Sequence, residues 1–314
     1  MNNKQYGYDD ISLVPKKCIV SSRKLCDTSV KLGKFTFDIP VYPANMKTVV
    51  DIDTCIFFAK NNWFYTMHRF GVDNVLFIRQ MQKEKLFTSI SVGINNDSYE
   101  SLNILLKEKL EPDFITIDVA NAWSDQTYKM INFIKSQFNS FLIVGNVATR
   151  EAILDLQKWR VEACKVGIAV GKICITRNKT GVYRPMVSTL LDCCKDCSIP
   201  IIADGGIGEH GDIAKAISCG AQMVMAGSLF AGYDQSAGNI IEIDDRMYKE
   251  YYGSASKYNK SEYKNVEGKK ILIQYKGNMI KLLTELKEDL QSSISYVGGK
   301  KLSDLRDTGI YIVN

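Results

Sequence analysis

Apolar residues along this chain are grouped into short runs that do not alternate with polar residues. The runs are rich in β-branched and aromatic side chains, which is typical of strands buried on both faces of a parallel sheet. Eight runs follow one another in series: Val41–Ala44, Phe64–Met67, Thr88–Val92, Phe114–Val119, Phe141–Val144, Ala163–Ile168, Pro200–Ala203 and Gln222–Leu229.

The segments between these runs have helical spacing of apolar residues. One of them, 149–159, carries a stripe of Ala152, Ile153, Leu156 and Trp159. Thr149 at its start is a suitable N-cap. The other predicted helices are 98–107, 125–138, 185 to 195 and onward, and 279–290. Eight strand–helix units in series predict an α/β fold, a (β/α)₈ TIM barrel formed by a single domain over residues 1–314.

The interval 231–277, between the eighth run and the last helix, is much longer than a usual connection. It is rich in tyrosine and lysine and ends in the strand-like sequence KKILIQYKG. Long insertions at the catalytic end of a barrel usually form lids, so we expect a flap between strand 8 and helix 8. The alternative is a surface excursion without a fixed structure.

Charge and composition exclude several classes of protein. The chain has 40 Lys+Arg against 35 Asp+Glu, and this net charge of +5 is too mild for a dedicated nucleic-acid binder. No apolar run reaches the roughly 18 residues that span a bilayer, and the start lacks a signal-peptide core. We therefore expect a cytoplasmic protein with reduced thiols and with neither membrane nor nucleic-acid partners.

The nine cysteines and two histidines limit the chemistry that the chain can perform. His68 and His210 lie too far apart in sequence for a histidine-rich metal site. Cys194 and Cys197 form a C-x-x-C inside a predicted helix with no second pair, which favours a structural role over a redox or zinc site. Cys174 differs, because it lies in a Gly- and Lys-rich loop after the sixth run, where cations would stabilise a thiolate.

Other short motifs fail on their spacing. Gly167 and Gly171-Lys172 are one residue too close for a P-loop, and Ile173 stands where a serine or threonine should hold magnesium. No G-x-S-x-G elbow is present. His68 ends the second run and is expected to be a buried structural residue. Arg69 beside it is either a solvated charge or a contact for a phosphate.

Barrel active sites lie where the strands end, so polar residues and glycines at those positions are candidates. The glycines after the seventh and eighth runs favour phosphate binding over ordinary turns, because they let backbone N–H groups approach an anion. The candidates at the strand ends are Asp118, Asn121, Gly145, Asn146, Asp204, Gly205, Gly206, Gly227 and Ser228.

Longer motifs carry a resemblance over nearly the whole chain. They are PANMKTV, FYTMHRF, SISVG, GNVAT, PIIADGGI, HGDIAKAI, MVMAGSLFAG, YYGSAS and NVEGKK, together with KVGI and CITR around Cys174. With these motifs in this order, the chain resembles the family of IMP dehydrogenases and GMP reductases, and within it the short bacterial type of reductase.

The resemblance implies a purine nucleotide site. Asp204 would accept hydrogen bonds from the ribose hydroxyls, the glycines, Ser228 and Tyr252 would hold the 5′-phosphate, and residues 254–256 would face the base. The implied substrate-binding residues are Asp204, Gly205, Gly206, Gly227, Ser228, Tyr252, Ser254, Ala255, Ser256 and Gly268.

The resemblance also implies a mechanism. Cys174 would attack C2 of GMP, ammonia would leave, and NADPH would reduce the resulting thioimidate so that IMP departs. Thr176 and Glu267 would relay the proton that ammonia release requires. The implied cofactor-binding residues are Asp118, Asn121, Arg69 and Lys165.

The reductase activity is favoured over two alternatives. An insert-free IMP dehydrogenase is disfavoured because residues 231–277 contain no Arg-Tyr dipeptide to activate water, and no regulatory module interrupts the barrel. A nucleotide-binding protein without catalysis is the other alternative, motivated by Ala169 and Val170. The implied partners are GMP, IMP and NADP(H), and the implied assembly is a homotetramer.

Ala169 and Val170 stand where relatives have glycine and proline. A glycine at the first position suggests a left-handed backbone, which a residue with a β-carbon adopts at a cost. In relatives the carbonyls of this loop can hold potassium. The corresponding positions here are Ala169, Gly171 and Cys174, and the two substitutions argue against the cation.

Overall fold

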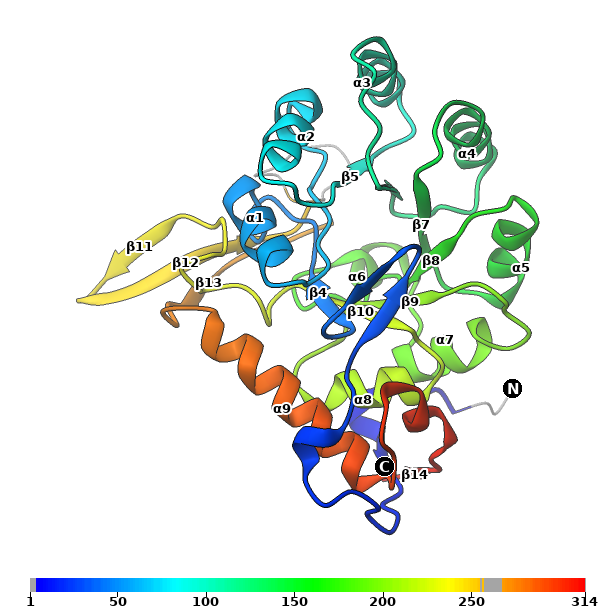
Figure 1. The fold of residues 1–314 in the computed structure, drawn as a ribbon, viewed down its shortest axis with the longest axis vertical. Coiled ribbons are helices and arrows are strands. Elements are labelled where there is room, and N and C mark those ends of the chain that lie inside the picture. Colours follow the sequence, from blue (N-terminus) through cyan, green and yellow to red (C-terminus); the bar gives the residue numbers. More distant parts are fainter. Residues whose placement is uncertain (1–3, 255, 257–266, 314) are drawn as a thin grey trace.

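The computed structural model describes residues 4–254, 256 and 267–313. Seven parallel strands form one curled sheet in the order β4–β10–β9–β8–β7–β6–β5 (Figure 1). Their bounds are β4 (Val41–Pro43), β5 (Ser89–Val92), β6 (Phe114–Asp118), β7 (Phe141–Val147), β8 (Ala163–Val166), β9 (Ile201–Asp204) and β10 (Met223–Ala226). Each strand lies on a predicted apolar run. Every residue of β5, β8 and β10 is buried, as expected for a sheet covered on both faces.

The predicted strand at Phe64–Met67 is wrong, because this buried segment forms no ladder in the described part of the chain. Its link to β5 is a hydrogen bond from Met67 N to Ser89 O at 3.0 Å. Aromatic packing holds Phe64 instead, with its ring centroid 4.7 Å from that of Tyr42 and 5.0 Å from that of Phe114. The observed sheet is therefore a curled seven-stranded half-barrel.

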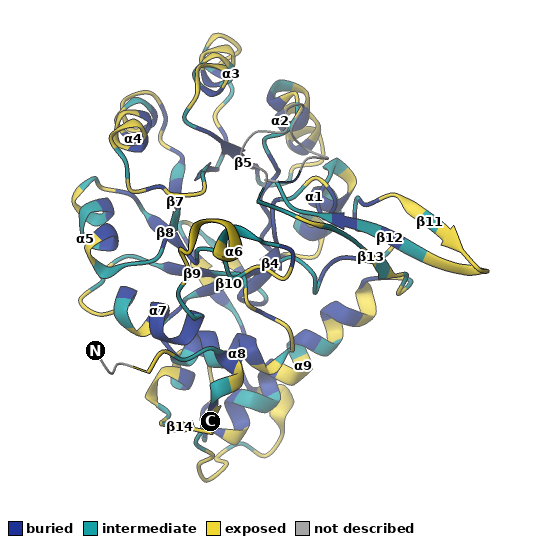
Figure 2. Cartoon of the chain, turned by 180° about the vertical axis from the view of Figure 1, so that it is seen from behind, coloured by how far each residue is buried: buried dark blue, intermediate teal, exposed yellow. Residues whose placement is uncertain are grey.

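Helices surround the sheet and turn their apolar faces toward it (Figure 2). The Thr149 side chain accepts a hydrogen bond from Ala152 N, which confirms the predicted N-cap. None of the described helices is long and apolar enough to cross a membrane. The helices are α1 (Ile52–Lys60), α2 (Asn74–Lys83), α3 (Asn96–Lys107), α4 (Asp125–Gln137), α5 (Arg150–Lys158), α6 (Thr176–Thr180), α7 (Met186–Cys193), α8 (Gly211–Ser218) and α9 (Ile280–Tyr296).

The chain ends add two small antiparallel pairs and three short 3₁₀ helices. The pair β2–β3 lies at the N-terminal end of the sheet. There the ring centroid of Phe37 is 5.3 Å from that of Phe64, and the ring centroid of Phe35 is 5.4 Å from that of Phe114. These elements are η1 (Tyr8–Asp10), β1 (Ile11–Leu13), η2 (Arg23–Leu25), β2 (Val30–Leu32), β3 (Phe35–Phe37), η3 (Leu302–Asp307) and β14 (Ile310–Ile312).

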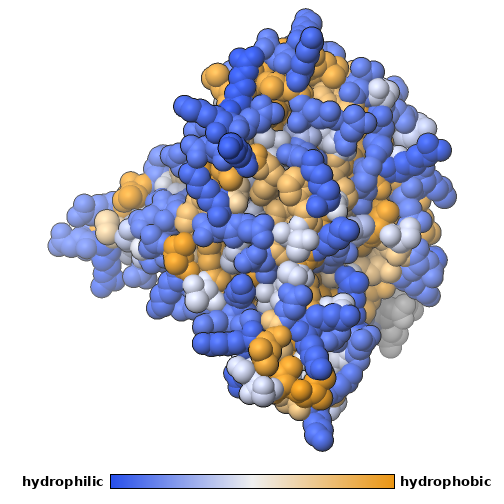
Figure 3. Space-filling model, viewed as in Figure 1, coloured by the Kyte–Doolittle hydropathy of each residue, from blue (hydrophilic) through white to orange (hydrophobic). Residues whose placement is uncertain are grey.

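The interval after β10 contains a three-stranded antiparallel sheet that projects from the body (Figure 1). Its strands are β11 (Ile240–Ile243), β12 (Arg246–Tyr252) and β13 (Lys270–Gln274). Sequence reading found only β13. The β11–β12 turn was missed because Asp244 and Asp245, at φ 49° and 58°, take a conformation usually marked by Asn-Gly. Polar side chains cover most of this sheet in the space-filling view (Figure 3). Residues 257–266 of the predicted flap lie outside the described residues.

Candidate active site

A cavity of about 360 Å³ opens at the C-terminal ends of the strands. It gathers candidates that lie up to 198 positions apart, from residue 69 to residue 267. The predicted site residues that line it are Arg69, Asp118, Lys165, Ala169, Cys174, Thr176, Asp204, Ser254 and Glu267.

Three of these residues form a chain of hydrogen bonds. The half-exposed Cys174 thiol donates to Thr176 Oγ1 across 3.2 Å. The Thr176 hydroxyl donates in turn to Glu267 Oε2. A thiol, a hydroxyl and a carboxylate in this order can move a proton between the sulfur side of the cavity and Glu267.

Backbone pairing explains how Glu267 reaches Thr176. Ile175 N donates to Glu267 O and Lys269 N donates to Ile173 O, both at 2.9 Å. Cys174 and Gly268 form an antiparallel bridge between these bonds. The cysteine loop is thus joined to the segment that leads into β13, and the bridge fixes which side chain faces Thr176.

A buried ion cluster forms the floor of the cavity. The Lys165 ammonium on β8 is 2.7 Å from Asp118 Oδ1 and 3.0 Å from Asp204 Oδ2, and its side chain is 1% exposed. Burial alone would lower the Lys165 pKa, but the two carboxylates raise it above its usual value. Burial likewise pushes the Asp118 pKa upward, and the Lys165 ammonium outweighs it and lowers the pKa. Lys165 and Asp118 therefore stay ionised.

Gly145 and Asn146 on β7 support this cluster. A β-carbon at Gly145 would lie 2.4 Å from Lys165 Cβ, so glycine is required where the lysine crosses over β7. Asn146 Nδ2 donates to Asp204 Oδ2 at 2.8 Å and to Gly167 O at 2.7 Å. Sequence reading placed Asn146 at a strand end but gave it no role. The sequence feature that could have indicated a role for Asn146 is its position directly after Gly145 at a strand end.

The loop between β8 and Cys174 has unusual backbone geometry. Gly167 has φ 138°, and a β-carbon there would lie 2.3 Å from Asp204 O. Ala169 has φ 61°, in the left-handed region, as the replacement of a glycine suggested. The Gly171 carbonyl accepts a hydrogen bond from Cys174 N at 3.0 Å, which shapes the turn before the cysteine.

The predicted phosphate-binding residues lie beside the cavity rather than on its wall. Gly205 and Gly206 have φ 92° and 77°, so both need glycine. A β-carbon at Gly227 would lie 2.2 Å from the hydroxyl oxygen of Tyr251. Ser228 is half-buried next to it. Glycine is therefore required at the ends of β9 and β10, by backbone conformation at Gly205 and Gly206 and by close packing at Gly227.

The predicted base-facing residues are described only in part. Ser254 lines the cavity, and Ser256 is fully buried with an Oγ that has no hydrogen-bond partner among the described residues. Ser256 also forms a bridge with Gly268. Tyr252 is held through its backbone by Thr48 Oγ1, and Ala255 lies outside the described residues.

The predicted cofactor residues differ in position. Arg69 lines the main cavity and a second one of about 600 Å³, and its guanidinium lies 4.5 Å from the Phe70 ring centroid. Its buried Nε has no hydrogen-bond partner in the described part of the chain. Asn121 is exposed, accepts from Trp123 N at 3.2 Å and does not line the cavity.

Other reactive side chains have structural surroundings. Burial lowers the His68 pKa to about 4, and its Nδ1 accepts a hydrogen bond from Phe70 N. Burial raises the Cys194 pKa to about 12 and also raises the Cys197 pKa, so both thiols stay protonated. All nine cysteines are free. Among the described residues no cluster of His, Cys, Asp and Glu is suited to a metal ion.

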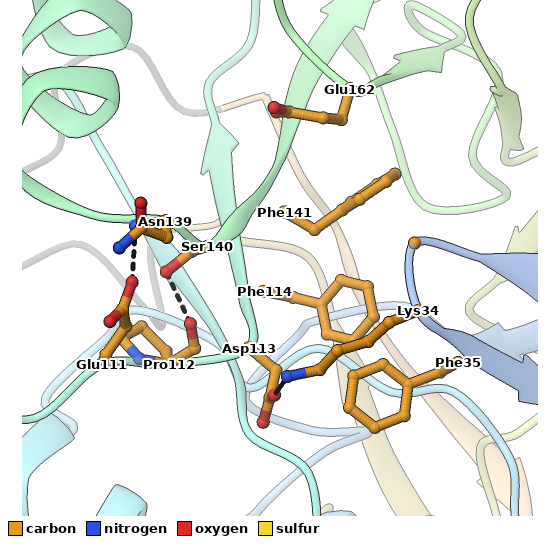
Figure 4. Close-up of a pocket in the computed structure, with 11 residues that line it drawn as sticks. Lys34, Phe35, Glu111, Pro112, Asp113, Phe114, Asn139, Ser140, Phe141 and Glu162 are labelled. Atoms are coloured by element: carbon orange, nitrogen blue, oxygen red, sulfur yellow. Dashed lines mark hydrogen bonds and ion pairs between the residues drawn. The ribbon is translucent and has the colours of Figure 1, made fainter.

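A further cavity of about 480 Å³ lies at the opposite end of the strands (Figure 4). Its carboxylates already serve the fold. Glu111 accepts from Asn139 N, Asp113 accepts from Thr88 and pairs with Lys34 at 2.7 Å, and Glu162 accepts from Leu142 N. Because barrel chemistry occurs at the other end, this cavity is not a candidate for the active site.

Comparison with known proteins agrees with the geometry. Residues 5–313 match the family model for the IMP dehydrogenase / GMP reductase domain. A protein of Chromobacterium violaceum named GMP reductase is 60% identical over 98% of both chains. GMP reductases of Acidovorax sp. (strain JS42) and Bacillus thuringiensis (strain Al Hakam) are each 50% identical over at least 96% of both chains.

Proposed function

We propose, since this chain belongs to the family of IMP dehydrogenases and GMP reductases, that it is an NADPH-dependent GMP reductase. It would convert GMP to IMP and release ammonia. The observation that carries the proposal is the hydrogen-bonded chain Cys174–Thr176–Glu267 at the cavity wall. The activity stated in the names of the relatives gives it further support.

Cys174 is the proposed nucleophile. Its sulfur would bond to C2 of the purine as the ring nitrogens take up the displaced electron pair, and the 2-amino group would then leave as ammonia. Leaving as ammonia requires a proton. The Cys174 thiol would lose its proton through Thr176 to Glu267 on attack, and the same relay would return that proton to the departing amino group. Once C2 has received a hydride, cleavage of the C2–S bond would release IMP and the Cys174 thiolate.

Binding of the nucleotide would use the groups around this chain. Asp204 would accept hydrogen bonds from the ribose hydroxyls. Gly205, Gly206 and Gly227, with Ser228 and Tyr252, would border the 5′-phosphate. Ser254 and Ser256, with their neighbour Ala255 and with Gly268, would border the base. The buried Oγ of Ser256 has no hydrogen-bond partner among the described residues, which supports a polar ligand there.

The residues present fit a nicotinamide cofactor. The main cavity and the 600 Å³ cavity share Arg69 and Phe70, and together they fall in the size range of cofactor pockets. A reduced nicotinamide supplies the hydride that reaches C2. Asp118 would border the nicotinamide. Arg69, whose Nε has no hydrogen-bond partner within the described ranges, would meet an anionic part of the cofactor. Asn121 would contribute only from the exposed rim.

The loop carbonyls do not favour a potassium ion. The Gly167 and Gly171 carbonyls accept hydrogen bonds from Asn146 Nδ2 and Cys174 N. Together with the side chains of Ala169 and Val170, this argues against the cation, and the proposed reaction uses none.

The finer features of the fold belong to the same proposal. The TIM barrel is one of them: Phe64–Met67 forms no strand, but it is buried beside β5 and joined to it by one backbone bond, so it would close the barrel there without strand pairing. The interval 231–277 would act as a lid whose last limb carries Glu267. A single domain, a homotetramer and a cytoplasmic location also stand as predictions.

A spectrophotometric comparison tests the proposal. GMP with NADPH should lose absorbance of the reduced nicotinamide, and IMP with NAD⁺ should give no gain. The reverse pattern would identify an IMP dehydrogenase. Tight binding of GMP or IMP without turnover by either pair would instead identify a binding protein, in which the strained Ala169 loop misplaces Cys174.

A further inference from the structure

Lys165 joins two carboxylates that come from strands three places apart in the sheet. Asp118 ends β6, Asp204 ends β9, and Lys165 lies on β8 between them. The strand register pairs Asp118 with Gly145 and Gly145 with Lys165, so the ammonium reaches Asp118 by crossing over one glycine. A side chain at position 145 would close this path, because its β-carbon would lie 2.4 Å from Lys165 Cβ.

Lys165 lines the cavity, but its ammonium is almost fully covered by its partners. Its side chain is 1% exposed, and its contacts are Asp118 Oδ1, Asp204 Oδ2 and, at 3.8 Å, Met225 Sδ. The two carboxylates are each 19% exposed, and both line the cavity. A ligand can therefore meet the carboxylates while Lys165 stays behind them.

We infer that Lys165 is a positioning residue that couples nucleotide binding at Asp204 to cofactor binding at Asp118. The identity of the two ligands rests on the proposed function, and the coupling goes beyond it. It also revises the sequence-based expectation that Lys165 contacts the cofactor directly.

The physical basis is a shared counter-ion. One ammonium holds two carboxylates, so a nucleotide whose ribose fixes Asp204 also fixes Lys165, and Lys165 in turn fixes Asp118. The second ligand then binds a carboxylate that is already ordered, so its binding costs less conformational entropy of the protein. Coupling between sites typically changes affinity by 5- to 150-fold, and it must be the same whichever ligand binds first.

The test measures affinities rather than turnover. IMP and NADPH cannot react with each other, so NADPH fluorescence titrations with and without saturating IMP give the coupling factor directly. In the wild-type protein we expect IMP to tighten NADPH binding by about tenfold. In K165M the coupling factor should fall below about 2, even if the separate affinities for IMP and for NADPH change little.

Two further variants keep the test decisive. G145A retains the lysine but obstructs its path, and it should also reduce the coupling if K165M does not fold. K249M is the matched control, because Lys249 is a buried lysine that donates to Asp234 O and Ser236 O outside the cavity. K249M should retain the wild-type factor.

The outcomes separate this inference from the proposed function. Wild-type protein that binds neither IMP nor NADPH would contradict the proposed function. Wild-type protein that binds both without coupling, or folded K165M and G145A with undiminished coupling, would overturn the role of Lys165.

Discussion

The Thr176 hydroxyl donates a hydrogen bond to the carboxylate of Glu267, 91 residues further along the chain. Backbone pairing sets the contact, since the bonds from Ile175 N to Glu267 O and from Lys269 N to Ile173 O flank the Cys174–Gly268 bridge next to it. A proton relay is thus built into the join between the cysteine loop and the segment before β13.

Removing the acid from this relay should slow catalysis without weakening binding. In E267Q the amide oxygen can still accept the Thr176 hydrogen bond but cannot take up a proton, so kcat should fall by about 10²- to 10⁴-fold. The Kd for IMP should stay within about threefold of wild type. Steady-state kinetics and a binding titration check both values.

Two comparisons test whether Thr176 and Glu267 act as one unit. The double variant T176V/E267Q should be little worse than either single variant, because groups that act together are not additive. E250Q is the control, since Glu250 pairs with Lys270 outside the cavity. Fully additive losses would show that the two residues act separately.

Sequence reading predicted most of the sheet and several helix positions, because buried parallel strands and amphipathic helices leave strong periodic signals. Thr149 is confirmed as an N-cap, and the helix predicted at 279–290 is found within α9, where Leu282, Leu283, Leu286 and Leu290 are buried. The strand prediction failed at Phe64–Met67, because the apolar residues of this segment serve aromatic ring packing rather than strand pairing.

The site could be predicted from the sequence only as a set of residue types. The family motifs brought Cys174, Thr176 and Glu267 together, but no local pattern shows that Lys165 lies beneath two carboxylates. The roles of Gly145 and Asn146 depend on strand register, which sets neighbours across the sheet rather than along the chain.

Close packing of Gly227 against Tyr251 predicts a mutation and its rescue. In G227A the new methyl would lie 2.2 Å from the Tyr251 oxygen, so stability should fall by about 1–3 kcal/mol and KM for GMP should rise. Adding Y251F removes that oxygen and leaves Cζ at 3.3 Å, which should restore most of the loss. Thermal unfolding and kinetics measure both effects.

G211A provides the comparison for this pair, because no atom lies within 4 Å of a β-carbon at Gly211. It should leave stability within about 0.5 kcal/mol of wild type. A G227A protein that Y251F does not improve would contradict the packing explanation.

The left-handed backbone of Ala169 predicts that glycine stabilises this position. This conformation costs an alanine about 1–2 kcal/mol in the folded state. Glycine removes that cost, but it also gives the unfolded chain more conformational entropy, which cancels part of the gain in stability. A169G should therefore raise the free energy of unfolding by up to about 1 kcal/mol in urea denaturation. A59G in α1 should lower it by about as much, because helices disfavour glycine. If A169G and A59G changed the free energy of unfolding in the same direction, strain at Ala169 would be contradicted.

Burial of His68 predicts a loss of stability in mild acid. Burial lowers its pKa in the folded state to about 4 from an ordinary 6.5. As the pH falls below 6.5 the unfolded chain takes up a proton that the folded protein resists, so the folded state is progressively disfavoured. The contribution of neutral His68 to the free energy of unfolding is fully present above pH 6.5. About 2 kcal/mol of this free energy should be lost between pH 7.5 and 5.

The variant H68N isolates this effect, because an amide oxygen can accept the Phe70 N–H bond without titrating. Urea denaturation at several pH values should show a smaller decline for H68N than for wild type. Parallel curves would show that another group causes the acid sensitivity.

The reaction stoichiometry, measured on wild-type protein and C174A side by side, tests the central claim most directly. With GMP and NADPH, the wild type should form one IMP and release one ammonia for each NADPH consumed, and C174A should form none while still binding IMP. NADPH loss without ammonia, or undiminished turnover by C174A, would contradict a reductive deamination that proceeds through Cys174.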